Sequence, residues 1–144
     1  MKKLSLLLSS LFLVLSLNSF AQEETKVDNP NAPVIVFESD EIDYGTIDRN
    51  SEPQRVIKFK NTGKSPLVIT NCAGSCGCTV PSCPKDPIMP GQSGELKVKY
   101  DTNRVGPINK TVTVKSNASN DVVYLKVKGK INDTPEKDEF PAKK

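Results

Sequence analysis

The strongest constraint on the fold is a two-residue alternation of apolar and polar side chains that runs through most of the chain. Residues 95–100 show it best, because apolar side chains occupy one side of an extended backbone, at Leu96, Val98 and Tyr100, and charged side chains the other. The same period recurs in residues 57–60, 111–115 and 123–130. Since successive side chains of a strand point to opposite faces, the pattern predicts half-buried β-strands. No window shows the apolar stripe of an amphipathic helix.

Clusters of turn-forming residues divide these runs, as at Asn61-Thr62-Gly63 and Pro90-Gly91. Regular short strands with turns between them predict an all-β fold, a single immunoglobulin-like antiparallel β-sandwich of about seven strands. The strands are expected at residues 34–38, 42–46, 54–60, 66–71, 94–100, 109–116 and 121–131.

Lysines occupy many of the outward positions of the expected strands. We interpret them as a solvated surface that also discourages edge-to-edge strand pairing. The alternative is a basic face for an acidic envelope partner, such as a polyanionic glycan. The seven lysines are Lys58, Lys60, Lys97, Lys99, Lys126, Lys128 and Lys130.

The first 21 residues have the features of a secretory signal peptide. Two lysines precede an apolar stretch at residues 4–17, and Ser19 and Ala21 place small side chains where signal peptidase reads the chain. We expect cleavage between Ala21 and Gln22. The apolar stretch is short for a membrane span of about 20 residues, so we expect no stable membrane insertion after cleavage.

The remaining chain divides into a folded unit and two polar ends. We expect a flexible leader at residues 22–33, the sandwich at residues 34–131 and a disordered polar tail at residues 132–144. Without the first 21 of the 144 residues, 18 basic residues remain against 17 acidic ones, so the net charge falls from +3 to +1. This balance gives little support to nucleic-acid binding, and we expect no nucleic-acid partner.

The composition excludes several classes of catalytic site. The chain has no histidine, so it has no imidazole general base, no Ser-His or Cys-His nucleophile pair and no metal shell that contains histidine. Asp43, Asp48 and Asp101 are scattered, and isolated carboxylates in turns usually cap or solvate the backbone. We therefore expect a protein that is not an enzyme and that needs no cofactor.

All four cysteines lie in one short segment with the spacing C-x3-C-x-C-x4-C: Cys72, Cys76, Cys78 and Cys83. This spacing is neither that of a zinc ribbon nor the C-x-x-C of thioredoxin-like enzymes. An even number of cysteines in an exported chain favours disulfides over free thiols. We favour two structural disulfides, one of them between Cys72 and Cys83, which flank a reversal of the chain.

Two other interpretations of this segment stay open. If Gly77 is extended, the α-carbons of Cys76 and Cys78 lie about 6.6 Å apart, so a disulfide between them needs Gly77 to bend the chain. A strained disulfide of this kind is easily reduced, which would suit thiol exchange, with a disulfide oxidoreductase as the main enzymatic alternative. In the third interpretation, Cys76 and Cys78 chelate Cu(I), or all four cysteines bind Zn(II).

Four motifs together resemble a known bacterial family. They are Asp43-Tyr44-Gly45-Thr46-Ile47, then Phe59-Lys60-Asn61-Thr62-Gly63 with Pro66-Leu67, then Ser75-Cys76-Gly77-Cys78-Thr79, then Pro87-Ile88 with Pro90-Gly91 and Gly94. The family is the one called domain of unknown function 1573, and the resemblance covers about residues 37–131. It implies an exported protein of Bacteroidota or related bacteria with a Hydin-like or major-sperm-protein-like immunoglobulin sandwich.

The family has no established activity, so the resemblance implies fold and compartment only. It matches Cys76 and Cys78 to the Cys-Gly-Cys pair of the family. Cys72 and Cys83 fall outside the family pattern, which implies a local disulfide added to the shared pair.

We therefore expect an exported, non-enzymatic binding or scaffold module in the periplasm or cell envelope of a Gram-negative bacterium, stapled by disulfides. Its expected partner is an envelope protein, docked at sheet edges and loops by strand addition. The alternative is a thiol-redox or copper-handling protein that uses Cys76-Gly77-Cys78. The sequence leaves the oligomeric state open.

Overall fold

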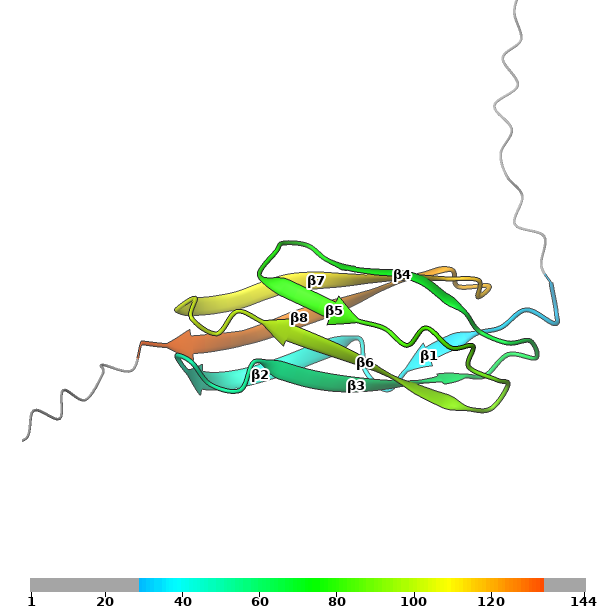
Figure 1. Ribbon diagram of the computed structural model, residues 1–144, viewed down its shortest axis with the longest axis horizontal. Helices are drawn as coiled ribbons and strands as arrows, with labels where there is room; N and C mark the ends of the chain where they lie inside the picture. The colour runs from blue at the N-terminus through cyan, green and yellow to red at the C-terminus, as the bar shows by residue number, and fades with distance from the viewer. Residues whose placement is uncertain (1–28, 134–144) are drawn as a thin grey trace, which may run out of the picture.

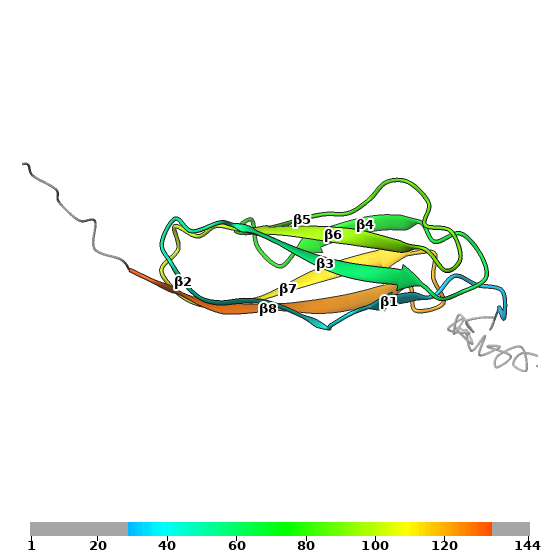
Figure 2. The same ribbon diagram turned by 90° about the horizontal axis from the view of Figure 1, so that it is seen from below.

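The computed structural model describes residues 29–133 as two four-stranded sheets that stack face to face, elongated along the strands (Figures 1 and 2). No helix occurs within these residues. Sheet I has the order β1 (Ile35–Phe37), β3 (Gln54–Asn61), β6 (Ser93–Tyr100) and β5 (Thr79–Ser82). Sheet II has the order β2 (Glu41–Asp48), β8 (Val122–Asn132), β7 (Gly106–Ser116) and β4 (Ile69–Gly74).

The core lies between the two sheets and is built from the alternate positions that the sequence predicts to point inward. In β6, Leu96, Val98 and Tyr100 are buried, and the charged residues between them are exposed. The rings of Phe37 and Phe59 lie 5.2 Å apart, which suits a tilted aromatic pair within the core. The all-β sandwich predicted from the alternation is confirmed.

The structure has eight strands rather than about seven. The additional strand is β5, which pairs with β6 at the edge of sheet I. The predicted strand at residues 66–71 begins later, at Ile69, because Leu67 forms an isolated bridge with Ile88 before β4 begins. The sandwich is also not wholly antiparallel, since β2 runs parallel to β8.

The sandwich has four edge strands, two from each sheet. β4 and β5 are edge strands of different sheets, and they contact each other along one side of the sandwich. β1 and β2 are the other two edge strands, one from each sheet. Each open side of the sandwich is therefore bordered by one edge strand from each sheet.

The boundaries of the folded unit differ slightly from the prediction. The predicted signal peptide, residues 22–28 of the predicted leader and residues 134–144 lie outside the described residues. Residues 29–33, which the sequence assigns to the leader, contact the sandwich: the Ser65 hydroxyl donates to the Asn31 carbonyl at 2.5 Å, and Pro33 is buried. At the other end, Asn132 is the last residue of β8.

A buried asparagine organises the end of the sandwich where β3 ends. Asn61 is fully buried, and its side-chain amide donates to the carbonyls of Ser65 at 2.8 Å and Ile88 at 2.9 Å. Its side-chain oxygen accepts from the backbone N–H groups of Gly63 and Val34. Every polar atom of this side chain is therefore satisfied, as a buried amide requires.

All seven outward lysines of the prediction are exposed, but none lies on an edge strand. They belong to β3, β6 and β8, each of which has a neighbour on both sides. A lysine in the middle of a sheet face cannot block pairing at the edge. The interpretation of these lysines as protection against edge-to-edge pairing is therefore wrong.

Within residues 29–133 we find no helix long and apolar enough to span a membrane.

Candidate functional site

The four cysteines gather where the chain crosses from sheet II to sheet I. Cys72 lies on β4, and Cys76 and Cys78 lie in the turn at residues 75–78 that joins β4 to β5. Cys83 directly follows β5. β4 and β5 border the same open side, and the cysteines of this segment form two pairs beside it, Cys76 with Cys78 and Cys72 with Cys83.

Cys76 and Cys78 are joined by a disulfide. Their α-carbons are 5.2 Å apart, which is shorter than the distance across an extended residue and within the usual range for a disulfide. The chain bends at Gly77, and the Thr79 N–H donates to the Cys76 carbonyl at 3.1 Å to close the turn. The expected bend at Gly77 is thus present.

Hydrogen bonds attach the disulfide turn to both sheets. On the side of sheet II, the Ser75 N–H donates to the Thr111 carbonyl at 2.8 Å, and the Ser75 hydroxyl accepts from the Thr111 N–H. Beyond the end of β6 in sheet I, the Asp101 N–H donates to the Cys78 carbonyl at 2.9 Å. The turn is therefore held at two points and is not a freely projecting loop.

A buried threonine lies next to the disulfide. The Thr79 hydroxyl is 3.7 Å from the Cys76 sulfur and 3.8 Å from the Cys78 sulfur, within reach of weak O–H···S hydrogen bonds. Since bonded sulfurs carry no proton, the hydroxyl is the donor. In the sequence, Thr79 is the last residue of the motif Ser75-Cys76-Gly77-Cys78-Thr79, but nothing there indicates that its hydroxyl lies against the disulfide.

A glycine allows β4 and β5 to approach each other beneath the turn. A methyl group added at Gly74 would overlap the backbone carbonyl of Thr79, so any larger side chain would push the two strands apart. The sequence does not indicate this role of Gly74, because its contact with Thr79 arises only where the chain crosses from sheet II to sheet I.

Cys72 and Cys83 are thiols that lie next to each other, half-buried against the core. Burial raises the pKa of the Cys83 thiol well above its usual value, and a hydrogen bond to Cys72 raises it further. Cys83 therefore stays protonated at neutral pH, where a thiol is a poor nucleophile. The expected pair is thus brought together, but as two hydrogen-bonded thiols rather than as a disulfide.

The state of the four sulfur atoms determines what this segment can do chemically. The Cys76–Cys78 disulfide occupies both sulfurs of the alternative Cu(I) chelate, so neither is a thiolate in this state. The Cys72 and Cys83 thiols can lose two protons and two electrons to form a second disulfide. Within residues 29–133, no group of three or more His, Cys, Asp or Glu side chains is placed to hold a metal ion.

Solved structures share this fold at low sequence identity. A protein of unknown function from Porphyromonas gingivalis W83 superposes with a TM-score of 0.61 at 18% identity, covering 72% of this chain and 49% of that one. The ASH/PapD-like domain 7 of human CEP192 also gives 0.61, at 7% identity, with 81% and 97% covered. The periplasmic chaperone SfaE gives 0.50 at 12% identity, with 69% and 58% covered. These likenesses show an immunoglobulin-like, PapD-like fold.

This chain spans about half the length of the Porphyromonas gingivalis protein. Comparison with curated proteins gave no match. The sequence pattern of the family described as "Protein of unknown function (DUF1573)" matches residues 35–131, which is most of the chain and nearly all of the sandwich. The resemblance seen in the four sequence motifs is therefore confirmed, and the chain belongs to the DUF1573 family.

Proposed function

We propose that this protein is an exported, non-enzymatic binding module of the cell envelope that takes up an extended segment of an envelope protein as an added strand at the free edge of β4. Strand addition needs an edge whose backbone N–H and C=O groups are open to a partner. The observation that carries the proposal is the difference between β4 and the other three edge strands.

Two of the other edges are short or already covered. β1 has three residues, and the side chain of Asn120 occupies its free edge, where it accepts from the Ile35 N–H at 3.1 Å and donates to the Ile35 carbonyl at 2.7 Å. β5 has four residues and includes Pro81, which has no N–H to offer to an added strand.

The third edge is protected by shape and charge. β2 carries three carboxylates, and its pairing with β8 shifts between Asp43 and Thr46, around Gly45 with a φ of 66°. Charged side chains and bulges are common devices against edge pairing. β4, with the sequence ITNCAG, has neither a proline nor a charged residue, and Asn71 and Ala73 are exposed. Its pairing with β7 shifts between Ile69 and Asn71 and is regular from Asn71 to Gly74, so the absence of charged residues is what distinguishes it from β2.

Oxidation of the Cys72 and Cys83 pair would support the same function by fixing the position of β4. A disulfide between Cys72 and Cys83 would tie this strand to the end of β5 in the other sheet. Its formation transfers two electrons to an external disulfide, whose two sulfurs leave as thiols. A strand held in this way keeps its edge in place for a partner, which lowers the entropy cost of binding.

Export is supported by the sequence of the first 21 residues and by the fold, which this chain shares with a periplasmic chaperone. It also suits the presence of a disulfide, since disulfides persist in oxidising compartments. Amino-terminal sequencing of the protein isolated from the periplasm should begin at Gln22. A chain that begins at Met1 in that fraction would contradict cleavage.

Site-specific photo-crosslinking in living cells tests strand addition. A photoreactive amino acid at Asn71 on β4 should give a discrete adduct with an envelope protein, and the same probe at Val36 on β1 should give none. Ala73→Lys should reduce the adduct, because an edge lysine disfavours strand pairing. Thr113→Lys is the matched control, since Thr113 is paired with Ala73 but lies on the central strand β7.

Three results would contradict the proposal: no adduct from Asn71, equal adducts from Asn71 and Val36, or equal losses in the two lysine variants. Circular dichroism of both purified variants shows whether they remain folded.

A further inference from the structure

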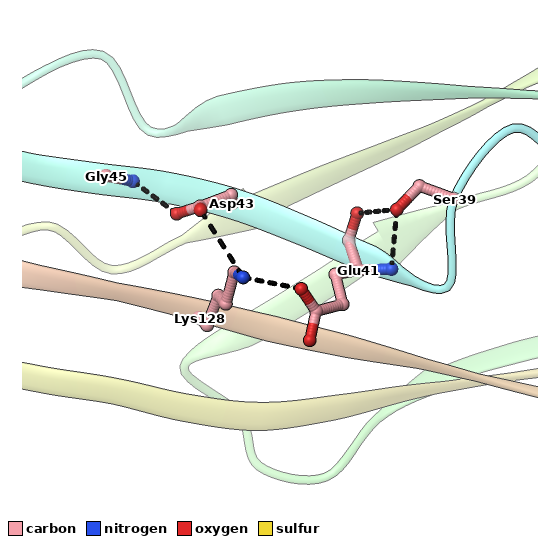
Figure 3. A network of polar contacts seen from close by, with 5 residues as sticks. All are labelled: Ser39, Glu41, Asp43, Gly45 and Lys128. Carbon is pink, nitrogen blue, oxygen red and sulfur yellow. Dashed lines mark hydrogen bonds and ion pairs between the residues drawn. The ribbon is translucent and has the colours of Figure 1, made fainter.

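The two outer faces of the sandwich differ in how their lysines are neutralised. The strands of sheet II carry five basic and three acidic residues, and those of sheet I carry five basic residues and Glu95 alone. On sheet II, Lys128 makes an ion pair with Glu41 and lies 3.6 Å from the Asp43 carboxylate (Figure 3). The three acidic residues of sheet II all belong to β2, beside the lysine-bearing strand β8.

The lysines of sheet I have no such partners among the residues that the structure describes. Within residues 29–133, no carboxylate lies within ion-pair distance of Lys58, Lys60, Lys97 or Lys99. Glu95 is paired in register with Lys58 but makes no ion pair with it, and Glu38 uses a side-chain oxygen to accept the Lys58 backbone N–H at 3.1 Å. The four ammonium groups therefore keep most of their charge exposed on one face.

These four lysines form a row that crosses the centre of sheet I obliquely, which we call the lysine diagonal: Lys60, Lys58, Lys97 and Lys99. Lys58 and Lys60 are two residues apart on β3, as Lys97 and Lys99 are on β6, a spacing of about 6.6 Å. Since Val56 is the register partner of Lys97, Lys58 and Lys97 are diagonal neighbours, about 7–8 Å apart. The row therefore presents positive charge at nearly even intervals.

We propose that the lysine diagonal binds an extended anionic polysaccharide, one that carries carboxylate or sulfate groups at regular intervals along its chain. An even row of charges suits a linear polyanion, because successive anionic groups can contact successive lysines without bending the polymer. This inference is independent of strand addition at β4, which uses an edge of the other sheet.

The other side chains of this face favour a polysaccharide over a nucleic acid or a membrane. Sites for single-stranded nucleic acids combine positive charge with aromatic side chains on which bases stack, and no aromatic residue occupies an outward position on sheet I. The exposed large apolar side chains on the strands of sheet I are Val36, Val56 and Val80, and each lies on a different strand. Interfacial binding to a bilayer needs a continuous apolar surface, which this face does not offer.

The test compares two variants of identical net charge. The diagonal variant is Lys58→Gln, Lys60→Gln, Lys97→Gln and Lys99→Gln together. The control variant is Lys115→Gln, Lys126→Gln, Lys128→Gln and Lys130→Gln, which removes four exposed lysines from the outer face of sheet II. Binding of the purified mature chain to polygalacturonate, dextran sulfate and uncharged dextran is measured by titration calorimetry at low and physiological salt.

We expect the wild-type chain to bind both anionic polymers but not dextran, with an affinity that falls as salt rises. The diagonal variant should bind at least ~10-fold more weakly with a smaller salt dependence, and the control variant within ~2-fold of the wild type. Polygalacturonate carries carboxylates and dextran sulfate carries sulfates. The polymer that binds more tightly therefore shows which of the two groups is preferred.

Equal losses in the two variants would overturn the proposal, since they would show a response to net charge alone. It would equally be overturned if the wild type bound neither anionic polymer, or bound single-stranded DNA or phosphatidylglycerol vesicles more tightly. If the diagonal variant does not fold, the double variants Lys58→Gln/Lys60→Gln and Lys97→Gln/Lys99→Gln replace it, and each should lose part of the affinity.

Discussion

Single polar side chains determine how several turns of this sandwich are held together. Asn61 is the clearest case, because its amide connects β3 to two turns and to the segment before β1. The sequence predicts a turn at Asn61-Thr62-Gly63 from local turn chemistry. It does not predict that the amide is buried, because Val34 and Ile88 each lie 27 residues away along the chain.

Replacement of Asn61 by Ala should lower the free energy of unfolding by about 2–4 kcal/mol, because buried carbonyl and N–H groups lose their partners together. Urea denaturation monitored by circular dichroism measures the change. Thr62→Ala, at the exposed neighbouring position, should change stability by less than about 0.5 kcal/mol. Similar values for the two variants would contradict a structural role for the buried amide.

A buried tyrosine gives the stability of the protein a dependence on alkaline pH. The Tyr44 hydroxyl lies 2.9 Å from the Pro53 carbonyl and 3.0 Å from the Val98 carbonyl, to which it can donate. Burial raises the pKa of Tyr44 from 10.0 to about 12, even though the nearby Arg55 opposes the rise. The unfolded chain therefore ionises first, and stability that is complete below pH 10 is lost as the pH rises toward 12.

Urea denaturation at about pH 9 and about pH 11 should show this loss in the wild type. Tyr44→Phe should reduce the difference between the two pH values, since no hydroxyl remains to ionise. Tyr124→Phe serves as the control because Tyr124 is 65% exposed, and it should retain the wild-type pH dependence. An unchanged pH dependence in Tyr44→Phe would assign the effect to other groups.

At the scale of elements, the strands with strict alternation could be predicted and the strand in the cysteine segment could not. β6 carries an uninterrupted pattern of period two, and its prediction differs from the structure by one residue. β5 has four residues and contains Pro81, so neither its length nor its composition indicates a strand. What makes it a strand is its pairing with β6, the next strand along the chain, which no local feature of residues 79–82 indicates.

The close packing of β6 on β3 depends on a glycine. A methyl group at Gly94 would lie 2.5 Å from the ring of Phe59, which is its register partner in β3. Gly94→Ala should therefore destabilise the protein by about 1–3 kcal/mol, because the buried ring must move. Thermal unfolding followed by circular dichroism measures this loss. Ser93→Ala at the exposed neighbouring position should leave the unfolding temperature nearly unchanged, and equal effects would contradict the steric argument.

At the scale of the whole molecule, the sandwich follows from the sequence but the neighbours of its edge strands do not. Short strands predict two sheets, yet nothing local indicates that β2 lies parallel to β8 or that β4 and β5 border one open side. The same limit applies to the cysteines. The spacing of the four cysteines is compatible with several disulfide pairings. The way the chain crosses between the sheets places Cys72 beside Cys83, and Cys76 is bonded to Cys78.

Oxidation of Cys72 and Cys83 should stabilise the whole sandwich by about 2–3 kcal/mol, because the bond closes a short loop and restricts the unfolded chain. The measurement compares thermal unfolding of protein in which mass spectrometry finds Cys72 and Cys83 as thiols with that of the same protein after oxidation by glutathione disulfide. Cys72→Ser/Cys83→Ser should show no gain on oxidation, and Cys76→Ser/Cys78→Ser should keep it. Mass spectrometry that finds both Cys72 and Cys83 as thiols after oxidation would contradict the second disulfide.

The described chain enters and leaves the sandwich at opposite ends of its long axis (Figure 1). Tension applied through Asn29 and Asp133 would therefore load the ladders of β8 along the strand direction, in shear. Many hydrogen bonds would have to break at once, whereas a hairpin pulled from one end opens bond by bond. β8 is about 36 Å long, at roughly 3.3 Å for each of its 11 residues, so the sandwich would resist extension along this axis.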